Sequence, residues 1–125
     1  MRIALVAIAL FVAACDGPPA GEVTLTSLKR DVFEPRCSFS ACHGGVNPAR
    51  GLDLVTDTHG ATVGVASQED EGVLIVEAGN AAGSLLFQVM EADVGAVRQM
   101  PPGASVGDDI LARVEAWIDG GAPND

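Results

Sequence analysis

Aromatic side chains and positive charges are scarce in this sequence. Its 125 residues include one Trp, four Phe and no Tyr, and 7 Lys and Arg residues stand beside 17 Asp and Glu residues, which gives a net charge of −10 at pH 7. Such acidity argues against binding of nucleic acid or of anionic lipid headgroups, because both need a basic surface. It would suit a protein partner with a basic docking surface, although solubility alone also explains it.

Long apolar runs are scarce too, and the one that exists lies at the start of the chain. Residues 3–14 are all apolar, a run too short to span a bilayer but typical of the core of a signal peptide. It ends in Val12-Ala13-Ala14-Cys15, which resembles the lipobox of bacterial lipoproteins. We therefore expect residues 1–14 to be a cleaved signal peptide and Cys15 to be lipidated. An ordinary secretory signal with a nearby cleavage site is the alternative.

This leader predicts an exported protein, anchored by lipid to a bacterial membrane on its periplasmic side or at the cell surface. The chain has three cysteines, and lipidation would consume Cys15. Free thiols do not persist outside the cytoplasm. We therefore expect Cys37 and Cys42 to be joined to each other, to a metal or to a cofactor.

The rest of the sequence predicts one small all-α domain at residues 23–125, behind a short tether at residues 15–22 that contains Gly and Pro. From Thr24, apolar residues recur at helical spacing as far as Phe33, and Pro35 is expected to end this helix before Cys37. A short helix is expected at residues 85–90, and residues 74–76 are candidates for a short extended segment.

The strongest helical pattern lies near the C-terminus. Ser105 and Asp108 suggest a capping box at its start. The apolar stripe that follows consists of Ile110, Leu111, Val114, Trp117 and Ile118. Gly120 and Gly121 are expected to end this helix.

Chemistry is concentrated in residues 37–45, which read Cys37-Ser38-Phe39-Ser40-Ala41-Cys42-His43-Gly44-Gly45. Two cysteines with a histidine directly after the second are typical of c-type haem attachment, in which the thiols add to the vinyl groups and the histidine binds the iron. The gap of four residues between the cysteines is a less common variant of the usual two. Gly44 and Gly45 would let the backbone pass close to the haem. A Cys37–Cys42 disulfide beside an unrelated histidine is the alternative.

Met100 is the favoured second iron ligand. It precedes Pro101-Pro102, so its backbone is expected to be extended and its loop stiff. A methionine opposite histidine raises the potential of the iron and fills its sixth position. Met90 is the competing methionine, but it lies on the apolar face of a predicted helix and is better explained as part of the core.

His59 is the second histidine, and we interpret it as an exposed loop residue. It is also a candidate for a bis-histidine ligand in place of Met100, or for a zinc site with Cys37, Cys42 and His43. Zinc is disfavoured, because the adjacent Cys42 and His43 chelate one tetrahedral ion awkwardly and exported thiols are oxidised. The acidic residues 69–71 predict a solvated loop, and no nucleophile–base constellation is visible.

From about Val23 to Asn124 the chain resembles the monohaem class I cytochrome c-like domains of bacterial exported proteins. The segments that carry the resemblance are 32–37 with 42–45, then 51–54, 79–86, 99–103 (Gln99-Met100-Pro101-Pro102-Gly103) and 114–123. The last two of these are the most specific.

This resemblance implies one covalent haem c on Cys37 and Cys42, with His43 as the proximal and Met100 as the distal iron ligand. It also implies that the N- and C-terminal helices cross around the haem, which would bring Phe33 near Trp117. A buried porphyrin would fill the thin core that so few large side chains build, although an alanine-rich genome gives the same composition.

We therefore expect a one-electron carrier with redox protein partners, no small-molecule substrate and no enzymatic activity of its own. Two other functions stay open. The first is a haem-free lipoprotein module, closed by a Cys37–Cys42 disulfide, that binds another protein. The second is a haem protein with a weak or absent Met100 bond, which would give a gas sensor or a peroxidase-like site.

Overall fold

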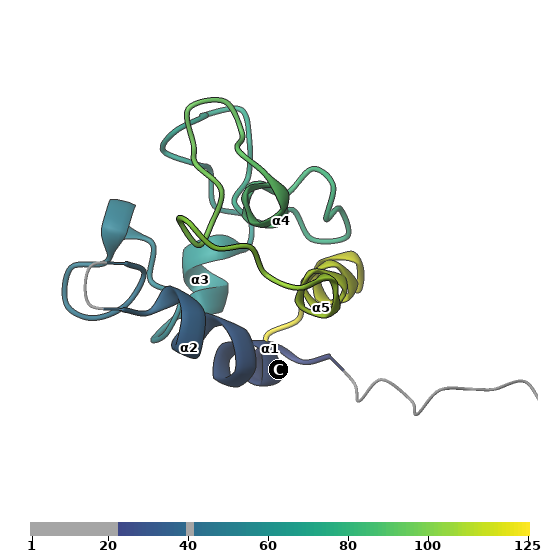
Figure 1. The fold of residues 1–125 in the computed structure, drawn as a ribbon. Coiled ribbons are helices and arrows are strands. Elements are labelled where there is room, and N and C mark those ends of the chain that lie inside the picture. Colours follow the sequence, from purple (N-terminus) through teal and green to yellow (C-terminus); the bar gives the residue numbers. More distant parts are fainter. Residues whose placement is uncertain (1–22, 40–41) are drawn as a thin grey trace, which may run out of the picture.

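The computed structural model describes residues 23–39 and 42–125. The expected signal peptide, tether and lipidated Cys15 lie outside the described residues. The helical segments, in chain order, are α1 (Leu25–Leu28), η1 (Lys29–Phe33), α2 (Glu34–Cys37), η2 (Ala49–Gly51), α3 (Thr58–Thr62), α4 (Leu85–Glu91) and α5 (Asp108–Asp119). Within the described part of the chain the regular structure is helical, with only single β-bridges beside it, so the all-α prediction is confirmed (Figure 1). No helix among these residues has the length and apolarity to cross a membrane.

The segments α1, η1 and α2 form one continuous N-terminal helix. Thr24 caps it, because its hydroxyl accepts a hydrogen bond from the Ser27 amide while the Ser27 hydroxyl accepts one from the Thr24 amide. The expectation that Pro35 ends the helix is wrong, since helical structure continues to Cys37. The turn before Pro35 is widened into a π-type turn, which lets the helix pass a residue that has no N–H to donate and whose ring crowds the preceding turn.

The C-terminal helix α5 follows the predicted pattern at its core face but not at its start. Ile110, Val114, Trp117 and Ile118 are buried, as the apolar stripe predicts. The expected capping box of Ser105 and Asp108 is wrong, because Gly107 is the N-cap and no side chain caps the helix. The negative charges of Asp108 and Asp109 in the first turn suit the positive end of the helix dipole instead.

The two ends of the domain meet. α1 packs against α5, and Phe33 and Trp117 belong to the same buried cluster. The guanidinium of Arg113 on α5 lies 2.9 Å from the Asp31 carboxylate on η1. The C-terminal residue also reaches the N-terminal helix, since a side-chain oxygen of Asp125 accepts a hydrogen bond of 2.7 Å from the Leu25 amide. The middle of the chain covers the opposite side of the core (Figure 1).

The middle of the chain supplies that second wall. Leu74 and Val76 form β-bridges with Ala66 and Val63, which confirms the expected extended segment. α4 follows where the sequence predicts a short helix, and the Leu86 amide donates a hydrogen bond of 2.9 Å to the Ile75 carbonyl. α4 also packs against α5. A cavity lies between this middle part and the end of α2.

Candidate functional site

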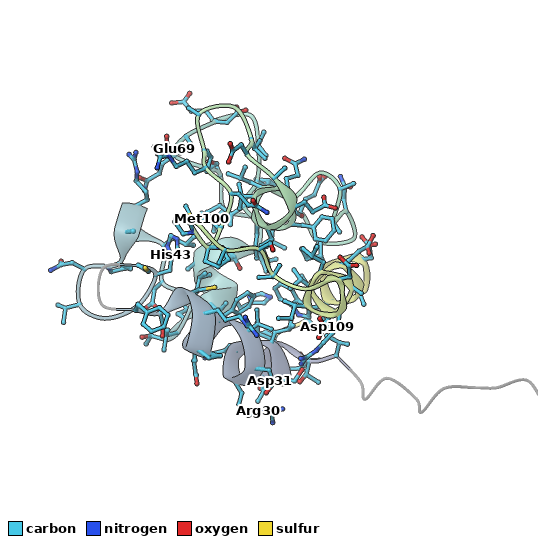
Figure 2. The ribbon with its side chains drawn as sticks, viewed as in Figure 1. Arg30, Asp31, His43, Glu69, Met100 and Asp109 are labelled. Atoms are coloured by element: carbon cyan, nitrogen blue, oxygen red, sulfur yellow. The ribbon has the colours of Figure 1, made fainter. Side chains whose placement is uncertain are left out.

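The cavity has a volume of about 190 Å³ and walls that are mostly apolar. Cys37, His43 and Met100 all line it, although Met100 is far from the other two in the sequence. Figure 2 shows His43 and Met100 together on the side of the molecule where α2 ends, away from Asp109 on α5. The other lining residues include Phe33, Leu52, Leu54, Val65, Ile75, Leu85, Leu86, Val89, Met90 and Val106. The fold thus brings three of the four predicted haem residues to one apolar space.

The cavity is partly open to solvent and mostly apolar in its lining. Concave apolar sites with a few polar groups are typical of small-molecule and cofactor binding sites.

Cys37 is the last residue of α2 and lies at the cavity wall. Burial, with a smaller contribution from the neighbouring Cys42 thiol, raises the pKa of the Cys37 thiol to about 11. Cys37 is therefore a neutral thiol at pH 7 and not a reactive thiolate. Cys42 is half-buried like Cys37, both are free thiols, and the Cys42 amide donates a hydrogen bond of 2.6 Å to the Phe39 carbonyl.

His43 is held at three points. Its amide donates to the Cys37 carbonyl at 2.7 Å, and its carbonyl accepts from the Leu54 amide at 2.9 Å. Its ring atom Nδ1 lies 3.3 Å from the Leu52 carbonyl oxygen. A carbonyl only accepts, so the favoured tautomer carries its proton on Nδ1 and keeps Nε2 free as a ligand.

Gly44 allows a close approach between its loop and the end of α2. A Cβ at this position would lie 2.8 Å from the Ser38 carbonyl oxygen, so the position is suited to glycine by its contact with Ser38. Gly45 has a φ of +79° and no neighbour that a Cβ would touch. The first glycine lets the loop close on α2, and the second lets it turn.

Met100 is half-buried and lies on a loop tied to the end of α4. Its amide donates a hydrogen bond of 2.7 Å to the Val89 carbonyl. The neighbouring Gln99 side-chain amide donates to the carbonyl of Glu91 at 2.9 Å, and the Gln99 backbone amide donates to the Asp93 carboxylate at 2.7 Å. Gln99 belongs to a segment that carries the resemblance, but its role is visible only in the structure, where it caps the C-terminal end of α4 and fixes the loop that carries Met100.

Met90 also lines the cavity, from α4. Only 4% of its surface is exposed, and it belongs to the buried core cluster, which confirms its expected place in the core. The cavity therefore presents two thioethers, one on a helix within the core and one on a loop.

His59 does not lie in an exposed loop, so that expectation is wrong. It is half-buried on α3, and its Nε2 lies 3.1 Å from the Ala122 carbonyl oxygen. Asp57 caps this short helix by accepting a hydrogen bond from the Gly60 amide, which turns His59 toward the C-terminal segment. His59 is not among the cavity-lining residues, and no three His, Cys, Asp or Glu side chains of the described segments come together as a metal-holding group.

A charged pair that the sequence analysis missed lies at the cavity rim. Arg50 and Glu69 both line the cavity, and their charged atoms are 3.0 Å apart. The predicted solvated loop at residues 69–71 is exposed at all three positions, yet Glu69 also has this cation as its partner. The sequence carries no signal for the pair, because the two residues belong to separate loops.

Comparisons with known proteins add nothing to this geometry. No protein-family model matches the chain, and searches of curated proteins and of solved structures also found no match.

Proposed function

We propose that this chain is a membrane-anchored c-type cytochrome that carries one covalent haem and transfers single electrons between redox partners outside the cytoplasm. One observation carries the proposal: His43 and Met100, from distant parts of the chain, line the same apolar cavity as Cys37. A nitrogen ligand, a thioether ligand and two thiols are the donor set that a hexacoordinate c-type haem uses. Cys42 is not among the lining residues of the described segments, but it directly precedes His43, so the residues present fit a haem.

Each of these residues has a distinct task in the proposal. Cys37 and Cys42 would hold the haem through thioether bonds, and His43 and Met100 would bind its iron. When bound, the haem supplies the exchange of one electron between ferric and ferrous iron. The Leu52 carbonyl keeps the His43 ring in the tautomer that offers Nε2, since Nδ1 holds the proton.

The surroundings of the site support electron transfer more than bond-making chemistry. The mostly apolar walls would surround a bound haem with a low-dielectric environment, which is one of the features that set the potential of the iron. The Val89 and Gln99 contacts hold the loop of Met100 in place, so Met100 would be available to bind the iron in competition with a gas or a peroxide. For this reason we favour the electron carrier over a gas sensor or a peroxidase-like site.

A redox partner would meet the loop that carries Cys42 and His43. Two apolar side chains stand exposed on this loop, Phe39 at 66% and Val46 at 96% exposure. Apolar side chains at the centre of a contact, with complementary charges around them, are usual for protein interfaces. Because the chain is acidic, the partner is expected to carry a basic docking surface.

The proposal is tested by expressing the full chain in a bacterial host with a c-haem maturation system and recording an alkaline pyridine absorption spectrum. A haem signal that stays with the polypeptide through acid-acetone extraction is expected from the wild-type chain. The Cys37→Ser/Cys42→Ser variant is expected to lose it. A cytochrome matured in the same host serves as the positive control.

A colourless wild-type protein in a host that matures the control would contradict the proposal. If that protein also had no free thiols, a Cys37–Cys42 disulfide in a haem-free binding module would replace it. If the protein carries haem, binding of carbon monoxide by the unmodified ferrous form would indicate an open iron position, and a sensor or peroxidase-like site would replace the carrier.

A further inference from the structure

The cavity has one polar end. Arg50, Ser67, Gln68 and Glu69 line it there, whereas most of the remaining wall is apolar. Arg50 and Glu69 are the only Asp, Glu, Lys or Arg residues among the described residues of this wall. A ligand that fills the cavity therefore meets apolar side chains over most of its surface and a cation at one edge.

The polar end is formed by two loops that are joined across the rim. Arg50 and Glu69 bridge them at 3.0 Å, with 73% and 30% of their side chains exposed. Arg50 and Gly51 both have left-handed backbone conformations, with φ of 57° and 70°, which turns the chain sharply at this point. A Cβ on Gly51 would lie 3.8 Å from the Gln68 side-chain nitrogen, so the two loops are in van der Waals range.

We propose that this end of the cavity takes the carboxylate side chains of the bound macrocycle, with the Arg50 guanidinium shared between Glu69 and a ligand carboxylate. The inference rests on the proposed function and adds the orientation of the haem in its pocket. Burying a carboxylate among apolar side chains without a partner is strongly unfavourable. The carboxylates therefore have to leave the pocket where a cation and water are available, and Arg50 marks that place.

Glu69 weakens the hold of this rim on the ligand carboxylates, whereas Arg50 strengthens it. Its carboxylate competes for Arg50 and repels a second carboxylate at the same rim. A guanidinium can serve two carboxylates through different N–H groups, because it presents five donors in a planar fork. Arg50 is therefore the positioning residue for the carboxylates, and Glu69 limits how strongly they are held.

The test uses the haem-loaded full chain and its resonance Raman spectrum, in which the bending band of the haem carboxylate side chains responds to their hydrogen bonds. Arg50→Gln is expected to shift this band toward the position of an unpaired carboxylate, and Glu69→Gln is expected to shift it the opposite way. The reduction potential is expected to fall in Arg50→Gln, because a nearby positive charge favours the electron-rich ferrous state, and to rise in Glu69→Gln.

Arg30→Gln is the matched control. Arg30 is 71% exposed and pairs with Asp31 at 2.6 Å, so its substitution removes the same charge from a similar ion pair. Figure 2 shows Arg30 and Asp31 at the end of the molecule away from Glu69. This variant is expected to leave the Raman band in place. Arg50→Lys keeps the charge without the fork, and is expected to restore most of the potential but only part of the band position.

Two negative outcomes are distinguishable. If the wild-type chain attaches haem but Arg50→Gln, Arg50→Lys and Glu69→Gln all leave the carboxylate band unmoved, the orientation is wrong and the cytochrome proposal stands. If the wild-type chain attaches no haem, both proposals are wrong. Should Arg50→Gln yield too little protein, the Arg50→Lys and Glu69→Gln spectra decide the question.

Discussion

The carbonyl oxygen of Leu52 lies 3.3 Å from Nδ1 of His43. This contact orients the only histidine of the cavity and determines which of its ring nitrogens is free. Leu52 and Leu54 together flank the histidine, one at its ring and one at its backbone carbonyl. The His43 ring is thus oriented by contacts within the chain itself.

Met100→Ala is expected to open the sixth iron position of the haem-loaded protein. The ferrous form of this variant should bind carbon monoxide, and its reduction potential should fall, because a thioether opposite histidine favours the ferrous state. Carbon monoxide difference spectra and potentiometry measure both effects.

Met90→Leu is the control for this experiment, since it removes the other thioether of the cavity and nearly conserves volume. It should change neither the carbon monoxide spectrum nor the potential by much. If the ferrous form of Met90→Leu bound carbon monoxide and that of Met100→Ala did not, Met90 would be the sixth iron ligand.

Gln99→Ala is expected to loosen the Met100 loop without emptying the cavity. Loss of the hydrogen bond from the Gln99 side-chain amide to the Glu91 carbonyl should lower the free energy of unfolding by about 1 kcal/mol. It should also speed the replacement of Met100 by an added ligand such as imidazole. Chemical denaturation and stopped-flow absorption measure the two quantities.

Gln88→Ala is the matched control, because the Gln88 side chain donates to the Ala82 carbonyl at the other end of α4. It should cost a similar free energy but leave the ligand-exchange rate unchanged. Equal rates in the two variants would show that Gln99 does not hold the loop.

Gly44→Ala is expected to destabilise the cysteine loop. A new methyl group would lie 2.8 Å from the Ser38 carbonyl oxygen, and overpacking of this kind costs about 1–3 kcal/mol. The yield of haem-loaded protein should fall with it. Thermal unfolding monitored by circular dichroism gives the stability, and the pyridine spectrum gives the haem content.

Gly45→Asn is a less disruptive substitution at the neighbouring position. Gly45 has a φ of +79° with open space around its Cβ position, and asparagine tolerates left-handed conformations better than most residues. This variant should be closer to wild type than Gly44→Ala. The reverse order would mean that the turn, and not the contact with Ser38, is the strict requirement.

Asp31 is expected to contribute to stability in acid. Hydrogen bonds from Arg30 and then from Arg113 lower the pKa of its carboxyl from 3.8 to about 2. The folded state therefore holds the ionised form more strongly than the unfolded state does, so this contribution is present above about pH 4 and is lost as the pH falls toward 2. The Asp31 side chain is 34% exposed and both of its partners reach solvent, which keeps the effect small and sensitive to salt.

The measurement is the melting temperature of wild type and Asp31→Asn from neutral pH down to acid, at low and at high salt. The difference between the two proteins should shrink as the pH falls, and it should be smaller at high salt throughout. A difference that stays constant down to pH 2 would show that Asp31 acts through packing and not through its charge.

Local sequence patterns were sufficient to predict the N- and C-terminal helices and some of the candidate site residues. The apolar spacing in residues 25–33 and 110–118 predicts the two helices that contribute Phe33 and Trp117 to the same buried cluster. The adjacency of Cys42 and His43, and the Met100-Pro101 pair, single out residues that do line one cavity or stand next to it. These predictions succeed because helical periodicity and the spacing of ligands along a chain are local properties.

Several sequence-based expectations fail for one common reason. Pro35 does not end its helix, and His59 lies against Ala122. In each case a wider turn or a partner outside the local pattern decides the outcome. Packing overrides local preference wherever the tertiary contact is worth more than the propensity.

The sequence by itself determined the all-α class and the presence of helices near residues 25–33, 85–90 and 110–118, and it singled out Cys37, His43 and Met100 as candidate site residues, because these follow from periodicity and from residue chemistry. Only the tertiary structure decided that Leu52 orients His43, that Gln99 holds the Met100 loop, and that Arg50 faces Glu69 across the rim. Those pairs join loops whose relative position depends on burying a shared core. No local pattern encodes that position, since a loop takes its place from the elements packed beneath it.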